Sequence, residues 1–226
     1  MRIEGPGSQD SRRSPEVVST SMSTTPLPSP SPHSRQAHTQ VPIHPPIAGR
    51  WSARGFDSSA TLHPDALTGL LEAARWAASW HRRQPVRFLV GIRGDQTYAT
   101  LSALLSEGNS YAKAAGALVL VCADEGDDEA AARYAHVDAG AAAANLEVEA
   151  VTRGLITHQM AGFDSNGART AFQIPAQVRP LMVIAIGSAA DPATLDAAIV
   201  ERDSAPRQRR DLREVAFAQT WGQPWT

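Results

Sequence analysis

Apolar and polar residues follow a helical period in some segments of the chain and form short apolar runs in others. Between residues 63 and 80, Leu67, Leu70 and Ala74 fall on one face at helical spacing. Pro64 suits the first turn of such a helix, because a proline there forfeits no intrahelical hydrogen bond. We therefore predict an amphipathic helix in this segment.

The rest of the chain alternates between the two patterns. Short apolar runs predict three strands, at residues 86–92, 117–123 and 181–187. Helical spacing or capping residues predict four further helices, at residues 95–105, 127–153, 165–172 and 192–202. Strands that alternate with helices indicate a mixed α/β or α+β domain.

The centre of the longest predicted helix, residues 138–150, consists largely of small side chains. Small residues let helices approach one another closely, which favours a place in the middle of the core or at a subunit interface. A simpler alternative is an alanine-rich helix with high intrinsic propensity. Gly154 is expected to end the long helix in either case.

Composition divides the chain of 226 residues into two unequal parts. Residues 1–46 hold nine of the sixteen prolines and no Phe, Trp or Tyr. Such a segment cannot bury enough apolar surface to offset the entropy of ordering it. We therefore expect a disordered Pro/Ser-rich tail over residues 1–46 and a folded domain over residues 47–226. Either Met1 or Met22 could correspond to the true start codon.

Charge and cysteine content exclude several classes of protein. A net charge of −2 gives no overall field that would recruit nucleic acid or an acidic membrane surface. Cys122 is the only cysteine, so neither an intrachain disulfide nor a multi-cysteine metal site can form. No apolar run approaches the roughly 20 residues of a membrane span, and no secretory h-region is evident. We expect a cytoplasmic protein without a bound metal.

Common catalytic and nucleotide-binding motifs are absent from the sequence: GxGxxG, GxxxxGK[ST], GxSxG and HExxH. What remains is arginine, because the chain has one lysine and twenty arginines. They gather near residues 50–54, 82–83 and 207–210. Guanidinium groups from such distant segments could converge on a phosphate, or could simply form a solvated basic surface.

Five segments, in order, resemble the nitroreductase family of FMN-dependent oxidoreductases. The first is RWSARGFD, with Arg50, Ser52, Arg54 and Phe56 at the family spacing. The others are AASWHRRQPV after the first helix, DAGAAAANL, GLITHQMAGFD, and VRPLMVIAIG followed by PRQRRDLREV. The similarity spans about residues 50–215.

This resemblance implies an α+β sandwich with a mixed, mainly antiparallel sheet flanked by helices. It also implies a homodimer with FMN at the interface. Hydride from NADH or NADPH would pass through flavin N5 to a small acceptor such as a nitroaromatic, a quinone or an activated alkene. The flavin would carry the chemistry, so no catalytic side chain is expected.

Site residues follow from the resemblance position by position. Arg50, Ser52 and Arg54, with Trp51 between them, would hold the flavin phosphate and ribityl chain. Gly162 would offer its N–H to flavin N5. The other implied contacts are Ala161 beside Gly162, Asn109 at the pyrimidine edge, Arg207 and Arg209 (with Arg210 as a substitute) at the phosphate, and Ser79 and Trp80 from the partner subunit.

Three positions depart from the family pattern. Ala78 stands where the family has proline, Arg82 where it has asparagine, and Val86 where it has tryptophan. Arg82 would bring a cation close to the flavin. These departures motivate a second hypothesis, an FMN-binding or storage protein with little or no turnover. A third is an arginine-rich protein that binds another phosphorylated ligand.

Overall fold

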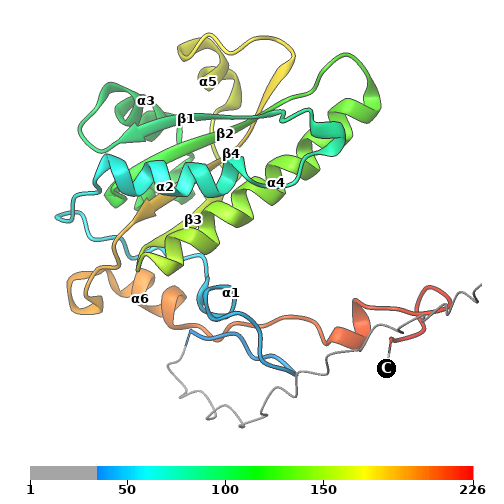
Figure 1. Ribbon diagram of the computed structural model, residues 1–226. Helices are drawn as coiled ribbons and strands as arrows, with labels where there is room; N and C mark the ends of the chain where they lie inside the picture. The colour runs from blue at the N-terminus through cyan, green and yellow to red at the C-terminus, as the bar shows by residue number, and fades with distance from the viewer. Residues whose placement is uncertain (1–34, 226) are drawn as a thin grey trace, which may run out of the picture.

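A four-stranded antiparallel sheet forms the centre of the structure, a computed structural model that describes residues 35–225 (Figure 1). The strand order is β1-β2-β4-β3, and each neighbouring pair runs antiparallel. The strands are β1 (Val86–Ile92), β2 (Ala117–Asp124), β3 (Ile156–Met160) and β4 (Val178–Gly187).

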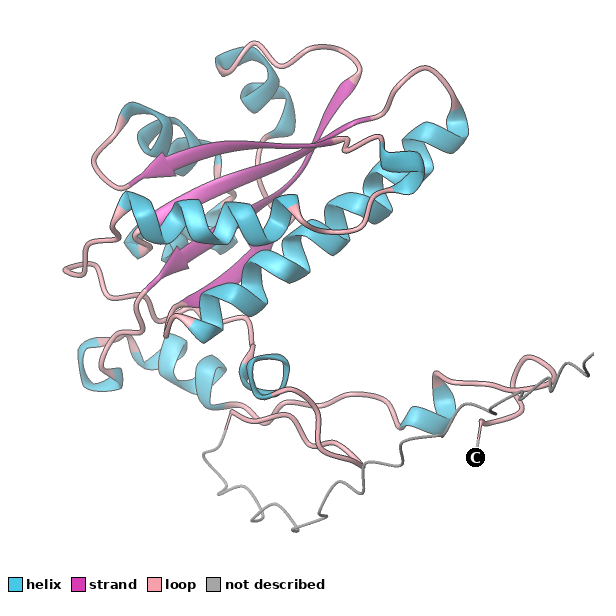
Figure 2. Cartoon of the chain, viewed as in Figure 1, coloured by secondary structure: helices cyan, strands magenta, loops and turns pink. Residues whose placement is uncertain are grey.

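Helices cover both faces of this sheet (Figure 2). The α-helices are α1 (Pro45–Gly49), α2 (Pro64–Arg75), α3 (Gln96–Leu104), α4 (Glu129–Thr152), α5 (Ser165–Ala171) and α6 (Ala197–Ser204). The 3-10 turns are η1 (Trp80–Arg82), η2 (Glu107–Ala114), η3 (Pro192–Thr194) and η4 (Leu212–Glu214). Together they confirm the α+β sandwich with a mainly antiparallel sheet.

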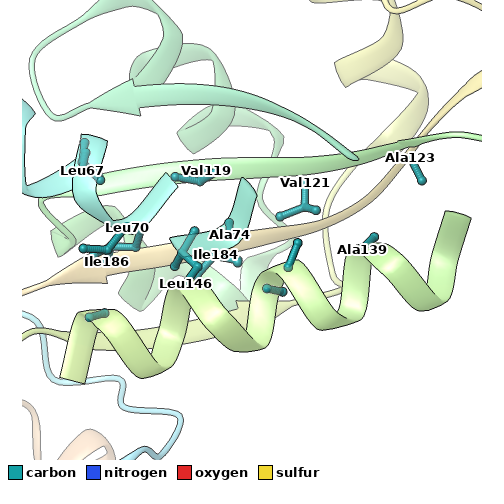
Figure 3. Packing of buried hydrophobic residues seen from close by; sticks show 14 of the residues in the cluster. Leu67, Leu70, Ala74, Val119, Val121, Ala123, Ala139, Leu146, Ile184 and Ile186 are labelled. Atoms are coloured by element: carbon teal, nitrogen blue, oxygen red, sulfur yellow. The ribbon is translucent and has the colours of Figure 1, made fainter. Parts of the chain in front are cut away.

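Strand β2 is buried on both faces, and its side chains alternate between two cores. Ala117, Val119 and Val121 face the cluster that includes α2 and α4, as Figure 3 shows for the two valines. Leu118 and Leu120 face the cluster that includes α3 and α5. This strict period of two is the geometry of a strand between two helical layers.

Helix α4 supports the first core and bears out the predicted long helix. Asp128 caps its N-terminus by accepting a hydrogen bond from the Ala131 N–H, at 2.8 Å. Ala139 and Ala143 are fully buried, so α4 lies close to the sheet and to α2. Gly154, at φ +74°, follows the last turn in the left-handed conformation that glycine adopts most easily.

Three segments differ from the sequence-based elements. The single helix predicted over residues 192–202 is instead two elements, η3 and α6, because Leu195 between them is extended. Strand β3 lies in the stretch that the family resemblance treats as a loop, and its Thr157 and His158 are buried polar residues. Their polarity hides the strand from a hydrophobic pattern. The first predicted helix ends at Arg75, and His81 and Gln84 in the following segment have positive φ.

The start of the described chain lies against the start of the C-terminal arm. Most of the predicted tail, residues 1–34, falls outside the described residues, while residues 35–44 lie against the start of the C-terminal arm, residues 205–225. The arm leaves the body of the molecule (Figure 1) and carries the exposed Trp221 and Trp225. None of the helices in residues 35–225 has the length and apolar character needed to cross a bilayer.

The crossing of β1 and α3 gives a direct stability prediction. A Cβ at Gly91 would lie 2.4 Å from the Tyr98 backbone nitrogen, whereas one at Gly108 would meet nothing within 4 Å. We expect Gly91→Ala to lower the free energy of unfolding by about 1–3 kcal/mol, the usual cost of overpacking. Gly108→Ala, the matched control, should change it little. Urea denaturation of both variants measures this, and equal stability would contradict the packing described.

Candidate functional site

An extended segment, residues 50–56, runs beside β3 and presents alternate side chains to one side. Ser52 forms a parallel bridge with Thr157, and the Ala53 N–H donates to the Thr157 carbonyl at 3.3 Å. The Arg54 N–H donates to the Asp203 carboxylate at 3.0 Å. Because extended residues two apart share a face, Arg50, Ser52 and Arg54 project to the same side.

Arg50 is held by a buried carboxylate from α4. Glu147 is 3% exposed and accepts hydrogen bonds from Thr157 Oγ1 at 2.9 Å and from Gln159 Nε2 at 2.8 Å. Its Oε1 lies 3.5 Å from Arg50 Nη1. A buried charge is tolerated only when it is paired and hydrogen-bonded, so this network sets where the Arg50 guanidinium lies.

A cavity of about 570 Å³ opens beside this network. Arg50 and Ser52 line one wall, and Glu147 and Gln159 also face it. The remaining lining residues are Ile47, Ala144, Asn145 and Val148. The cavity is therefore bounded by the arginine segment and by the outer part of α4.

A second group of arginines gathers at the same end of the sheet. The Arg207 guanidinium donates to the carbonyls of Ala48, at 2.8 Å, and Arg35. Burial, together with the nearby charges of Arg50, Arg209 and Arg35, lowers the pKa of Arg207. Like charges this close favour an anion among them.

Most of this positive charge has no acidic partner. Within residues 35–225, no carboxylate lies within ion-pair distance of Arg35, Arg207 or Arg209, whose guanidinium groups bond to backbone carbonyls. Arg50 alone in this group faces a carboxylate, Glu147. The cluster thus has the charge, the donors and the neighbouring cavity of an anion site.

Gly162 lies two residues after the end of β3, against the η2 segment. Its carbonyl accepts from the Ser106 N–H at 3.0 Å and from Asn109 Nδ2 at 2.8 Å, whereas its own N–H has no partner among the described residues. A Cβ here would come within 2.7 Å of Asn109 Nδ2. The peptide is thus fixed with its N–H free to donate to a ligand.

Tyr111 links Gly162 to the arginine segment, and sequence reasoning missed it. Its ring lies 5.4 Å from the Arg54 guanidinium and 5.1 Å from the ring of His158. Its hydroxyl is 3.4 Å from Asn109 Oδ1. Burial raises the pKa of the Tyr111 phenol, which keeps the hydroxyl protonated. No motif marks this tyrosine, because its role depends on contacts between distant segments.

The residues after α2 form a separate group. The Trp80 N–H donates to the buried Asp138 carboxylate at 3.0 Å, and its ring stacks between His81 and Tyr134, at 4.3 and 4.8 Å. Asp138 precedes Glu147 by nine residues on α4, which corresponds to about 14 Å. Within one chain, Trp80 and its neighbours therefore lie apart from Arg50.

The remaining predicted residues fall into these two groups. Ser79 accepts from the Gln84 N–H at 3.1 Å and lines a second cavity, of about 510 Å³, between α2, β1 and α4. Arg82 is exposed at φ +57°. On the arginine side, Trp51 packs under the Arg35 guanidinium at 4.2 Å. Ala161, Arg209 and Arg210 are exposed.

Cys122 offers no nucleophile to either group. It is buried in β2, and burial raises the pKa of its thiol to about 11. Across residues 35–225 there is also no cluster of three or more His, Cys, Asp or Glu side chains able to hold a metal ion. Among the described residues, the arginine cluster offers guanidinium groups for an anion and the Gly162 peptide offers a hydrogen-bond donor.

Comparisons with known proteins agree with this geometry. The family model described as the nitroreductase family matches residues 47–188. An uncharacterized 15.4 kDa protein in the ask 5' region of Mycolicibacterium smegmatis is 57% identical over 147 residues, which cover 62% of this chain and 99% of that protein.

Solved structures share the fold. An oxidoreductase containing FMN superposes with a TM-score of 0.74 at 28% identity, covering 81% of this chain and 95% of its own. A proposed nitroreductase in complex with FMN from Exiguobacterium sibiricum has a TM-score of 0.65 at 21% identity, covering 77% of this chain and 95% of its own.

The buried His158 predicts how stability depends on pH. Burial is the main cause that lowers the pKa of His158 from its usual 6.5, although its Nδ1 lies 2.8 Å from the Ala53 carbonyl. The folded state therefore binds fewer protons than the unfolded state just below that value. Stability should be full above pH 6.5 and should fall as the pH drops below it.

Glutamine at position 158 keeps a hydrogen-bond donor but cannot gain a proton. We expect His158→Gln to show a smaller loss of unfolding free energy than wild type between about pH 7 and pH 5. His44→Gln, at an exposed histidine, should follow wild type. Chemical denaturation at each pH gives the comparison, and identical slopes for all three proteins would contradict a buried neutral His158.

Proposed function

The chain belongs to the nitroreductase family, and on that premise we propose that it is an FMN-dependent oxidoreductase. It takes hydride from NADH or NADPH and reduces a small acceptor, such as a nitroaromatic, a quinone or an activated alkene. The observation that carries the proposal is a cluster of arginines beside Arg50 and Ser52 that has no acidic partner among the described residues: Arg35, Arg207 and Arg209. A phosphate monoester with nearly two negative charges is the anion that such a cluster suits.

The phosphate end of FMN fits residues from both ends of the domain. Arg50 and Ser52 lie on the cavity wall, and Arg207 and Arg209 come from the C-terminal arm. Arg54, which follows on the same side of the extended segment, would contact the ribityl chain. Arg210 stands next to Arg209 as a further donor. Several guanidinium groups offer the bidentate hydrogen bonds that phosphate oxygens accept.

The ring end fits the peptide at Gly162. Its unpartnered N–H would donate to flavin N5, and Asn109 holds the Gly162 carbonyl in place. Asn109 also lies where it would meet the pyrimidine edge. When bound, FMN supplies the hydride-transfer chemistry, so the chain need only bind, orient and tune it. Arg54 stacks on the protonated Tyr111 and brings a positive charge to this end.

A homodimer would unite the two groups that one chain keeps apart. The outward face of α4 carries exposed apolar or small residues: Tyr134, Val137, Gly140, Ala141 and Ala144. A two-fold axis crossing α4 midway between Asp138 and Glu147 would pair the helices antiparallel. Such an arrangement sets Asp138 and Trp80 of one copy opposite Glu147 and Arg50 of the other, so FMN would sit between subunits.

The proposed dimer predicts the effect of a charge on that face. We expect Ala141→Glu to weaken dimerisation by more than about 100-fold, because an unpaired carboxylate buried at an interface costs several kcal/mol. Ala103→Glu, on the exposed face of α3, is the matched control and should stay dimeric. Light scattering over a dilution series measures both. Wild-type protein that remains monomeric at every concentration would contradict the dimer.

In the alternative hypothesis, the protein binds or stores FMN but catalyses little or no turnover. Its motivation is Arg82, an exposed cation at positive φ in the segment that would face the flavin of the partner. A cation there could block the approach of a donor or an acceptor. The two functions predict different behaviour of the same bound flavin.

Anaerobic mixing of FMN-loaded protein with NADPH, and separately with NADH, distinguishes them. We expect one of the two to bleach the flavin absorbance far faster than it bleaches free FMN, the control, and a quinone added afterwards to restore it. Positioning of the reactants within one site is the physical reason for the acceleration. Flavin that stays yellow with both donors would contradict the oxidoreductase proposal and favour storage.

A further inference from the structure

We name residues 35–44 the N-terminal strap. The first residues of the strap form hydrogen bonds with the arginine cluster. The Arg35 guanidinium donates to the Ala205 carbonyl at 2.5 Å, and the Arg35 carbonyl accepts from Arg207. The Ala37 N–H donates to the Ala48 carbonyl at 2.9 Å. That same carbonyl accepts from Arg207. The strap, the end of α1 and the C-terminal arm thus meet at one point.

Arg35 occupies a defined position at this junction. Its guanidinium carbon lies 4.2 Å from the centre of the Trp51 ring. In the sequence, Trp51 stands between the predicted ligands Arg50 and Ser52. The residue is half-buried. Its charge is close enough to Arg207 to contribute to lowering the pKa of that arginine. Three segments remote in sequence therefore direct positive charge to the same place.

A purely structural arginine would not need this arrangement. Guanidinium carries five N–H donors, and the Arg35 side chain gives a hydrogen bond only to the Ala205 carbonyl among the described residues. Holding it near Arg207, on which the charges of Arg50 and Arg209 also act, costs free energy through repulsion between like charges. An anion bound among the four arginines would reverse the sign of that interaction.

We propose that Arg35 is a further binding residue for the cofactor phosphate, brought into the site by the N-terminal strap. This inference rests on the proposed function, because it presumes that the ligand of the cluster is FMN. It adds a residue that lies before the segment matched by the family model, residues 47–188. It also gives the strap a role in affinity, whereas composition alone predicts a tail outside the domain.

The substitution Arg35→Gln tests the side chain with little change to the backbone. The carbonyl that Arg207 contacts belongs to the main chain and stays in place. Riboflavin, which has the flavin ring and the ribityl chain but no phosphate, separates a phosphate contact from a general effect on the site. Arg213→Gln, at an exposed arginine on the same C-terminal arm, is the matched control.

Dissociation constants for FMN and riboflavin are measured on the full-length protein by calorimetry. We expect Arg35→Gln to weaken FMN binding by about 10- to 100-fold, the range for one charge-assisted hydrogen-bonded contact. Riboflavin affinity should stay within about 2-fold of wild type, because no phosphate is lost. Arg35→Lys should recover part of the FMN affinity, and Arg213→Gln should match wild type.

The outcomes separate failure of this inference from failure of the proposed function. Wild-type protein that binds neither flavin would overturn the proposed function itself. Wild-type protein that binds FMN, with Arg35→Gln unchanged or weakened equally for FMN and riboflavin, would overturn the role of Arg35 alone. Thermal unfolding of each variant shows whether it is folded. If Arg35→Gln has a folding defect, the ratio of FMN affinity to riboflavin affinity is measured on Arg35→Lys instead. A ratio equal to that of wild type would then overturn the role of Arg35.

Discussion

A buried carboxylate, Glu147, joins the core of the fold to the candidate site. It projects from α4, the helix that packs against both the sheet and α2, and it is 3% exposed. Its oxygens are satisfied by Thr157 and Gln159 on β3 and by Arg50. Because an unpaired buried carboxylate would cost several kcal/mol, the helix, the strand and the arginine segment are constrained to one another.

The same end of the molecule holds positive charge that no carboxylate among residues 35–225 pairs with. The guanidinium groups there donate to backbone carbonyls, which carry no compensating charge: those of Arg35, Arg207 and Arg209. Burial and the neighbouring positive charges together lower the pKa of Arg207. Like charges held close together destabilise the folded chain, and a bound anion would offset that destabilisation. Glu147 differs, because its charge is paired and hydrogen-bonded within the chain, whereas Arg35, Arg207 and Arg209 have no carboxylate partner among the described residues.

Much of the fold was readable from the sequence, because burial there follows local periodicity. The apolar run of β2 and the alanines of α4 each report a face that packs on the core. Strand β3 was not readable, because Thr157 and His158 are buried through partners far away in sequence, Glu147 and the Ala53 carbonyl. A hydrophobic pattern carries no signal for a polar strand of this kind.

The candidate site divides in a similar way. The family resemblance supplied Arg50, Ser52 and Gly162, whose types and spacing form motifs. Tyr111 and Arg35 belong to no motif. Their places depend on tertiary contacts, with the Arg54 guanidinium in one case and with Trp51 and the Ala205 carbonyl in the other. Such residues become candidates only when the folded chain shows what surrounds them.

We propose that the arginine cluster and the Gly162 peptide together form a flavin site. The most direct test is the absorbance spectrum of the full-length protein after incubation with FMN and removal of free ligand, followed by the mass of the ligand released on denaturation. We expect a flavin spectrum and one FMN per chain. Protein that stays colourless, or that releases a phosphorylated compound without a flavin, would contradict it.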